Sequence, residues 1–381
     1  MVALSIGMRA EITHTARTAN TVHTGNTAIG AHTAIGAQAA ISALSALSAL
    51  GALGALGALS GFTAPVAPAA PVAPVPHAQR PGLALMHPPS RPSGQPPDPP
   101  RFALVLGSGG VRISAALGLV EVLTQEGLAP DLVVGCSAGA LFGALIAAGH
   151  PAADAIRLAT TLWSAEVTRR RRWRAIPQML WPRLARFGPD FALRDDRLVR
   201  QRLTQAFGNQ RLQDLPTALR VSTTCADSGS AVVLQSGPLV AVLRAAVALP
   251  FMFSPQHIDG KRLMDGFISD PLPVSAAADA QAVLALGFES PMPYRVDGPS
   301  RLLAQMTSAM TNNLVQARLA GAQRPRLLTL LPTLQRRVGL FDTQAMPYLV
   351  EEGRRAARLA LAAIEQMLAG VDRAPVAAAW K

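Results

Sequence analysis

The sequence predicts an α/β fold for the part of the chain that begins near residue 101. Two segments carry this prediction, and each reads as a buried strand, a glycine-containing turn and a helix. The first runs from Phe102 to Gln125 and the second from Asp131 to Ala148. A third segment, residues 256–265, has Asp259-Gly260 between apolar residues, which is typical of a β-hairpin.

The first hundred residues differ in composition from the rest and carry no charge between Arg17 and Arg80. Ser-Ala-Leu and Gly-Ala-Leu triplets fill residues 42–59, and a period of three builds neither a helix face nor a strand face. Proline is frequent in residues 65–100, as in an extended linker. We therefore expect residues 1–100 to be low-complexity and disordered. Residues 37–59 are uncharged and long enough to span a bilayer, but their Gly and Ser content makes them a weak membrane-spanning candidate.

The basic balance of the chain indicates an anionic partner. The formal net charge is +12, and almost all of the positive charge is arginine, since only Lys261 and Lys381 are lysines. A coding bias towards Arg and Ala explains the total equally well. The two cysteines, Cys136 and Cys225, do not form a disulfide framework, and nothing in the sequence requires an oxidising compartment.

A glycine loop, Gly107-Ser108-Gly109-Gly110-Val111-Arg112, links the first predicted strand to its helix. Glycines bring backbone N–H groups close to a ligand, and such a loop at a helix N-terminus binds anions. The dinucleotide-binding fingerprint is incomplete, because Val111 or Ile113 stands where a third glycine is needed.

The second turn has the sequence Gly135-Cys136-Ser137-Ala138-Gly139. A Gly-x-Ser-x-Gly motif between a strand and a helix forces the serine into a sharp, exposed elbow. The motif predicts that Ser137 is a nucleophile, which needs a neighbouring base.

Histidine is the usual base, but only His150 and His257 follow residue 101. His150 lies at the far end of the helix after Ser137, roughly 20 Å away along its axis. No histidine follows Asp265, so the order Ser, acid, His of α/β-hydrolases is impossible with this acid. Asp265 therefore becomes the predicted base, although an aspartate with an ordinary pKa of about 3.9 is a weak one. A triad through His257 stays open if the hairpin folds over Ser137.

These segments together resemble the patatin-like phospholipase family from about Phe102 to Phe288, and more weakly to about Leu368. The matching motifs are Gly107 to Arg112, Gly135 to Gly139, Asp265-Gly266, residues 244–250 with Phe253 and Pro255, and Asp270-Pro271-Leu272-Pro273-Val274. The resemblance implies a three-layer α/β/α fold with a mostly parallel sheet and a lipid acyl hydrolase with a Ser–Asp dyad. It also implies a catalytic core at residues 101–290 and a C-terminal helical part, residues 291–381, packed on that core. Within this part, residues 304–319 and 348–368 read as amphipathic helices.

Carried over by resemblance, Ser137 attacks the acyl carbonyl and Asp265 takes its proton. The residues expected at the oxyanion hole are Gly107, Gly109, Gly110, Val111 and Arg112, with Arg112 steadying the loop. Gly135 and Gly139 shape the elbow, and Gly266 belongs to the dyad loop. We expect no cofactor and no metal, and the expected substrate is a phospholipid or another acyl ester.

Two residues depart from the family pattern, Ser108 and Ile113, each in place of a glycine. If position 113 required a positive φ, a β-branched residue there would be strained. This leaves open a catalytically impaired lipid- or membrane-binding protein, besides a thioesterase or general esterase with the same dyad.

Residues 163–200 interleave arginine with tryptophan and leucine, a composition suited to an anionic membrane interface. The membrane-binding candidates are Arg170, Arg171, Arg172, Trp173, Arg174 and Trp181. A solvated helix face and a nucleic-acid patch are the alternatives, and with lipid chemistry predicted elsewhere we expect no nucleic acid. The expected location is cytoplasmic or peripheral to a membrane.

Overall fold

The computed structural model describes residues 99–168, 171–322 and 326–371. The expectations for residues 1–98, including the disorder and the candidate span at residues 37–59, lie outside the described residues, as does Arg170. Within the described ranges, no helix combines the length and the apolar character that a membrane crossing requires.

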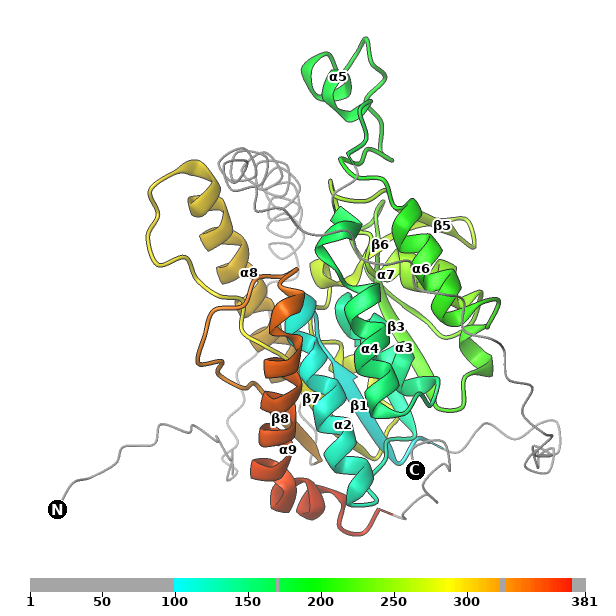
Figure 1. Ribbon diagram of the computed structural model, residues 1–381, viewed down its shortest axis with the longest axis vertical. Coiled ribbons are helices and arrows are strands. Elements are labelled where there is room, and N and C mark those ends of the chain that lie inside the picture. The colour runs from blue at the N-terminus through cyan, green and yellow to red at the C-terminus, as the bar shows by residue number, and fades with distance from the viewer. Residues whose placement is uncertain (1–98, 169–170, 323–325, 372–381) are drawn as a thin grey trace, which may run out of the picture. The chain divides into compact units, whose positions relative to one another are not determined.

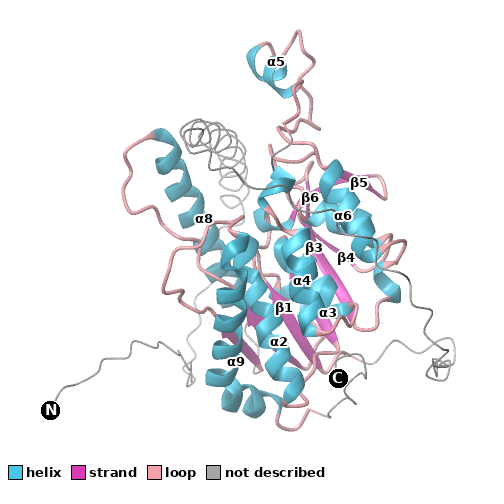
Figure 2. Ribbon diagram, viewed as in Figure 1, coloured by secondary structure: helices cyan, strands magenta, loops and turns pink. Residues whose placement is uncertain are grey.

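The described strands form one sheet in the order β5-β6-β3-β2-β1-β7-β8, with β4 paired to β3 (Figure 2). The central pairs β1–β2, β1–β7, β2–β3 and β7–β8 are parallel, whereas β4 and β6 run antiparallel to β3. The strands are β1 Phe102–Leu106, β2 Leu132–Cys136, β3 Ala218–Cys225, β4 Ala231–Leu234, β5 Gln256–Ile258, β6 Lys261–Asp265, β7 Ala282–Leu286 and β8 Leu327–Leu330.

The central strands are buried along their whole length, because helices cover both faces of the sheet. Every residue of β1, β2 and β7 is buried, and each strand is a continuous apolar run, as in parallel sheets that are covered on both sides. Such strands lack the alternating pattern of a half-exposed sheet.

Two apolar clusters separate the three layers. Phe102, Leu104 and Leu106 pack with α2, α3 and α9 on one face, whereas Ala103 and Val105 pack with residues 272–285 and the inner side of α8 on the other (Figure 1). The helices are α2 Ala115–Gln125, α3 Ala138–Ala147, α4 Ala152–Leu162, α5 Ala175–Leu180, α6 Arg197–Phe207, α7 Leu239–Ala246, α8 Pro299–Gly321 and α9 Met346–Leu368. The predicted three-layer α/β/α fold with a mostly parallel sheet is confirmed.

The C-terminal part contributes more than helices. The expected helices at residues 304–319 and 348–368 correspond to α8 and α9, but β8 between them also extends the sheet beside β7. This short strand was not predicted, since four residues carry little periodic signal. Helix α9 lies along α2, where Arg354 donates to Glu121 at 2.8 Å.

Candidate active site

Ser137 occupies a sharp turn between β2 and α3. Its backbone has φ 56° and ψ −125°, a conformation that is rare for a residue other than glycine and that fits the nucleophile-elbow geometry. Gly139 lets the turn approach β1, because a Cβ atom there would come within 2.5 Å of the Leu106 carbonyl oxygen. The strain is held by helix α3, which packs into the core immediately after the turn.

Strand β3 brings Ser137 and Asp265 to the same level of the sheet. Cys136, the residue before Ser137, pairs with Ser222 of β3, and Asp265 at the end of β6 pairs with the next residue, Thr223. The Ser137 hydroxyl donates to Oδ2 of Asp265 at 2.7 Å, and the backbone N–H of Phe267 donates to Oδ1 at 3.0 Å. Both carboxylate oxygens therefore have a donor.

The carboxyl group of Asp265 is fully buried, and this burial raises its pKa to about 7. The hydrogen bonds from Phe267 and Ser137 act in the opposite direction but are outweighed. A carboxyl group with this pKa accepts a proton far more readily than an exposed aspartate. It removes the difficulty that an ordinary aspartate is a weak base at neutral pH.

Cys136, next to Ser137, is a second possible nucleophile, but it is fully buried. Burial and the nearby carboxyl groups of Asp265 and Asp270 raise the pKa of its thiol well above the ordinary value. A thiol reacts as its thiolate, so Cys136 is unreactive in this environment.

A buried hydroxyl network fixes the loop that follows Asp265. Thr224 Oγ1 donates to the backbone carbonyl of Asp265 at 2.9 Å and lies 2.7 Å from Ser269 Oγ. The backbone N–H of Asp265 donates to the carbonyl of Ala248 at 3.1 Å. Both the N–H and the carbonyl group of Asp265 are therefore hydrogen-bonded, which fixes the backbone that carries the carboxyl group.

The amides of the glycine loop fall into two groups. Those of Gly107 and Val111 already donate within the protein, to the carbonyls of Leu286 and Leu340, each at 2.9 Å. They were expected at the oxyanion hole, but in this structure they are not free to face a substrate oxygen. The amides of Gly109 and Gly110 have no acceptor within the described part of the chain, which leaves them as the candidate donors.

Arg112 braces this loop with its buried guanidinium. Nε donates to the carbonyl of Gly109 at 3.1 Å, and Nη1 donates to the carbonyl of Glu289 at 2.8 Å. Burial lowers the pKa of the Arg112 guanidinium from its ordinary value. An arginine side chain is not deprotonated in proteins, so Arg112 carries a positive charge. Its contribution to the candidate site is through the side chain.

Ile113 does not have the strained backbone that a positive φ would impose. It lies in a buried 3-10 turn, Gly110–Ser114, and the positive φ values of the loop belong to Gly109 and Gly110. Its side chain packs against the Cα of Gly109, since a Cβ built there would lie 3.3 Å from Ile113 Cδ1. The reason for expecting an impaired loop is therefore absent.

Ser137 is hydrogen-bonded to Asp265 and not to a histidine of the described residues. The His257 side chain is largely exposed on β5, with Nε2 3.6 Å from Oδ1 of Asp190. His150 is half-buried beyond the end of α3.

Comparisons with known proteins identify the family of the region that contains Ser137 and Asp265. The sequence model of the family described as patatin-like phospholipase matches residues 104–278, which contain both Ser137 and Asp265. These residues belong to the patatin-like phospholipase family. An uncharacterized NTE family protein of Mycobacterium tuberculosis is 33% identical over 187 residues, which are 49% of this chain and 48% of that protein.

A further relative and a solved structure are also similar to this chain. Lysophospholipase NTE1 of Chaetomium globosum is 29% identical over 173 residues, or 45% of this chain and 11% of that protein. The crystal structure of VipD from Legionella pneumophila has a TM-score of 0.38 at 16% identity and covers 72% of this chain and 67% of that one. The chain spans about half the length of the mycobacterial relatives that it matches.

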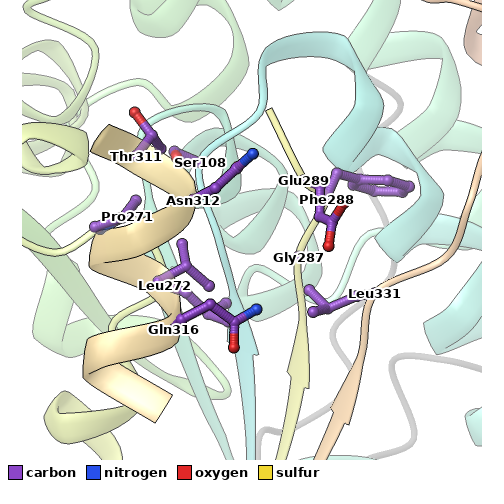
Figure 3. A pocket seen from close by; sticks show the side chains of 11 residues that line it. Ser108, Pro271, Leu272, Gly287, Phe288, Glu289, Thr311, Asn312, Gln316 and Leu331 are labelled. Atoms are coloured by element: carbon purple, nitrogen blue, oxygen red, sulfur yellow. The ribbon is translucent and has the colours of Figure 1, made fainter. Parts of the chain in front are cut away.

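Beside the patatin-like glycine loop lies a hollow at the carboxyl ends of β1, β7 and β8, under helix α8 (Figure 3). Its volume is about 370 Å³, including space open to solvent. Its lining includes Ser108 and Leu272 and, from α8, Thr311 and Asn312. Asn312 is held by hydrogen bonds with the backbone of Ser290, 2.8 Å to its N–H and 3.1 Å to its carbonyl.

The arginine and tryptophan segment includes α5, which lies clear of the sheet and the helices that cover it (Figure 1). Trp173 is 75% exposed and Leu184 86% exposed, and Trp181 and Leu180 are exposed as well. Of the membrane-binding candidates that the structure describes, none has a hydrogen bond with Ser137, whose hydroxyl donates to Asp265.

Several residues around the Ser137–Asp265 hydrogen bond had no signal in the sequence. The Phe267 N–H, the Thr224 hydroxyl and the Leu340 carbonyl act through hydrogen bonds set by register and loop packing. A hydrophobic pattern identifies elements and their faces, but it does not identify which backbone group meets which side chain.

Proposed function

We propose that this chain is a serine acyl hydrolase that cleaves fatty-acyl esters of phospholipids or lysophospholipids through Ser137 and Asp265. The observation that carries the proposal is the 2.7 Å hydrogen bond from the Ser137 hydroxyl to a buried carboxyl group whose pKa is raised to about 7. A nucleophile and a matched base within hydrogen-bond distance are the minimum for acyl transfer.

In the first half of the reaction, Ser137 Oγ attacks the acyl carbonyl carbon and its proton passes to Asp265 Oδ2. The amides of Gly109 and Gly110 hold the oxyanion, and each such donor contributes on the order of 3 kcal/mol. Asp265 then gives its proton to the leaving alcohol oxygen, and an acyl ester of Ser137 remains. In the second half, Asp265 takes a proton from water, the hydroxide attacks the ester, and the fatty acid leaves as Ser137 regains its proton.

A thioesterase or general esterase would use the same steps, and the leaving group alone distinguishes them. The family match and the lysophospholipase name of a relative favour lipid esters. The relaxed backbone of Ile113 weakens the alternative of a catalytically impaired lipid-binding protein.

The decisive experiment is labelling of the full chain with a fluorophosphonate probe, followed by a substrate panel. We expect labelling of the wild type, none of Ser137→Ala, and full labelling of Ser236→Ala, a control that removes an exposed hydroxyl. Lysophosphatidylcholine, phosphatidylcholine, an acyl thioester and a soluble short-chain ester then rank the substrates. An unlabelled wild type, or labelling that persists in Ser137→Ala, would contradict the proposal.

We also propose that the enzyme binds a membrane surface, where it meets its lipid substrate. Residues 171–187 expose Trp173, Trp181 and Leu184 beside several arginines, a combination that suits insertion into an anionic membrane interface. Each basic residue near such a surface contributes about 1 kcal/mol, so Arg174→Gln with Arg183→Gln should weaken binding about thirtyfold. Co-sedimentation with neutral and with anionic vesicles measures this. Equal pelleting with both kinds of vesicle would contradict the electrostatic part of the account.

A further inference from the structure

A short segment outside the family match contacts the glycine loop. We call residues 338–341 the strap; it lies in the connection between β8 and α9. The Leu340 carbonyl accepts two hydrogen bonds, one from the Val111 N–H at 2.9 Å and one from the indole N–H of Trp163 at 2.7 Å. A carbonyl oxygen has two lone pairs, so this acceptor is fully used.

Trp163 is built to hold the strap. It lies at the end of α4, its side chain is buried, and its ring stacks on that of Phe341 with centroids 5.1 Å apart and an angle of 12°. The Trp163 side chain thus contacts two consecutive strap residues, Leu340 through a hydrogen bond and Phe341 through stacking. The stacked, hydrogen-bonded indole also satisfies its one polar group in a buried position.

Hydrogen bonds from Arg112 and to the strap fix two successive peptide groups of the glycine loop, Gly109–Gly110 and Gly110–Val111. A trans peptide is planar, and its N–H and C=O point in opposite directions. Arg112 holds the Gly109 carbonyl and thereby fixes the direction of the Gly110 N–H, which shares its peptide plane. The Leu340 carbonyl holds the Val111 N–H and fixes the next plane. Gly110, between the two planes, has φ 62° and little freedom left to rotate.

We propose that the strap and Trp163 position the oxyanion loop, with Trp163 as a positioning residue that acts through the Leu340 carbonyl. This inference rests on the proposed function for its catalytic consequence. It means that residues 104–278 do not contain the complete site, since the loop that faces the acyl oxygen is held from residues 338–341.

Trp163→Phe in the full chain tests the proposal, because it removes the indole N–H and keeps a ring for stacking on Phe341. The control is Tyr348→Phe, which removes a different hydrogen bond to the β8–α9 connection, from the Gln335 N–H at 3.1 Å. Without substrate, hydrogen exchange of the peptide covering residues 107–113 should be about tenfold faster in Trp163→Phe and unchanged in the control. Unchanged exchange in Trp163→Phe would overturn the proposal without reference to activity.

With substrate, Trp163→Phe should lower kcat about tenfold and leave KM unchanged, because oxyanion contacts strengthen in the transition state. Should it fail to fold, Phe341→Leu removes the stacking and retains the indole N–H, and a smaller loss of kcat is expected. Full kcat in either folded variant of an active protein overturns the inference alone. Absence of Ser137-dependent turnover in the wild type overturns the proposed function, and this inference with it.

Discussion

The Ser137 hydroxyl lies 2.7 Å from Oδ2 of Asp265, and the two residues come from strands on opposite sides of β3. Ser137 is 5% exposed and Asp265 is 0% exposed. Burial has two effects on this pair. It raises the pKa of the carboxyl group towards neutrality, and it keeps water from competing for the hydrogen bond.

The first prediction concerns the pH dependence of the reaction. Asp265 accepts a proton only when it is ionised, and its pKa is raised to about 7. We therefore expect the rate of fluorophosphonate labelling to rise with pH and to reach half of its maximum near pH 7. Stopped labelling reactions across a pH series measure this. A half-maximum near the ordinary pKa of an exposed aspartate would contradict the environment described for Asp265.

The second prediction separates catalysis from stability at Asp265. Asp265→Asn removes the base, so turnover should fall by at least about a hundredfold. Folding behaves differently: the folded pKa of about 7 exceeds the unfolded value of 3.8, so the folded state binds this proton more tightly. The resulting stabilisation is complete below the unfolded pKa and is lost as pH rises through the folded pKa.

Asparagine carries no such proton. The Tm of Asp265→Asn relative to wild type should therefore increase between about pH 4 and about pH 7 and stay level above that range. Asp227→Asn, which changes a surface aspartate paired with Arg262, is the control and should leave turnover unchanged. If this relative Tm fell with increasing pH, ionisation of Asp265 would not destabilise the folded state, and the prediction would be wrong.

The sequence predicted the central strands β1 and β2, the helices that follow them, and a pairing of Ser137 with Asp265. Buried parallel strands are continuous apolar runs, and the elbow needs small residues on both sides of its serine, so β1, β2 and Ser137 are all readable. Asp265 followed from the scarcity of histidine and from the family pattern. Its raised pKa was not predictable, since that depends on how completely the folded protein covers the carboxyl group.

The glycine loop illustrates where sequence reasoning stops. Five residues were expected at the oxyanion hole, and the structure uses the amides of Gly107 and Val111 for internal hydrogen bonds. The acceptor for Val111 lies in Leu340, more than two hundred residues away in the sequence. A backbone contact between distant loops leaves no trace in residue type or periodicity. The strain feared at Ile113 also depended on a φ value that only the fold reveals.

The third prediction concerns Arg112, whose guanidinium joins the carbonyls of Gly109 and Glu289. Arg112→Lys keeps the charge but not the two-pronged geometry, so one of these carbonyls loses its donor. We expect kcat to fall roughly tenfold to a hundredfold with little change in KM, because the oxyanion donors lose their alignment. Steady-state kinetics measures the split, and Arg197→Lys at an exposed arginine provides the control. A rise in KM at constant kcat would instead assign Arg112 to ground-state binding.

The last prediction tests how closely the strap covers the loop, through a pair of glycines with similar backbones. Gly110 has φ 62° and Gly127 has φ 72°, so alanine is unfavourable at both by roughly 1–2 kcal/mol. A Cβ at Gly110 would also lie 2.5 Å from the Leu340 carbonyl oxygen, whereas a Cβ at Gly127 meets nothing within 4 Å. Gly110→Ala should therefore destabilise the fold by roughly 1–3 kcal/mol more than Gly127→Ala.

Denaturant unfolding of both variants measures that difference, and the conformational cost common to the two glycines cancels. Gly110→Ala should also lose most of its fluorophosphonate labelling at temperatures where it remains folded, because relief of the clash moves either the Leu340 carbonyl or the Gly110 N–H. Gly127→Ala should retain its labelling. Equal destabilisation by the two substitutions would mean that the strap moves away from a Cβ at Gly110 without a loss of stability. A strap that moves so easily could not hold the oxyanion donors in place.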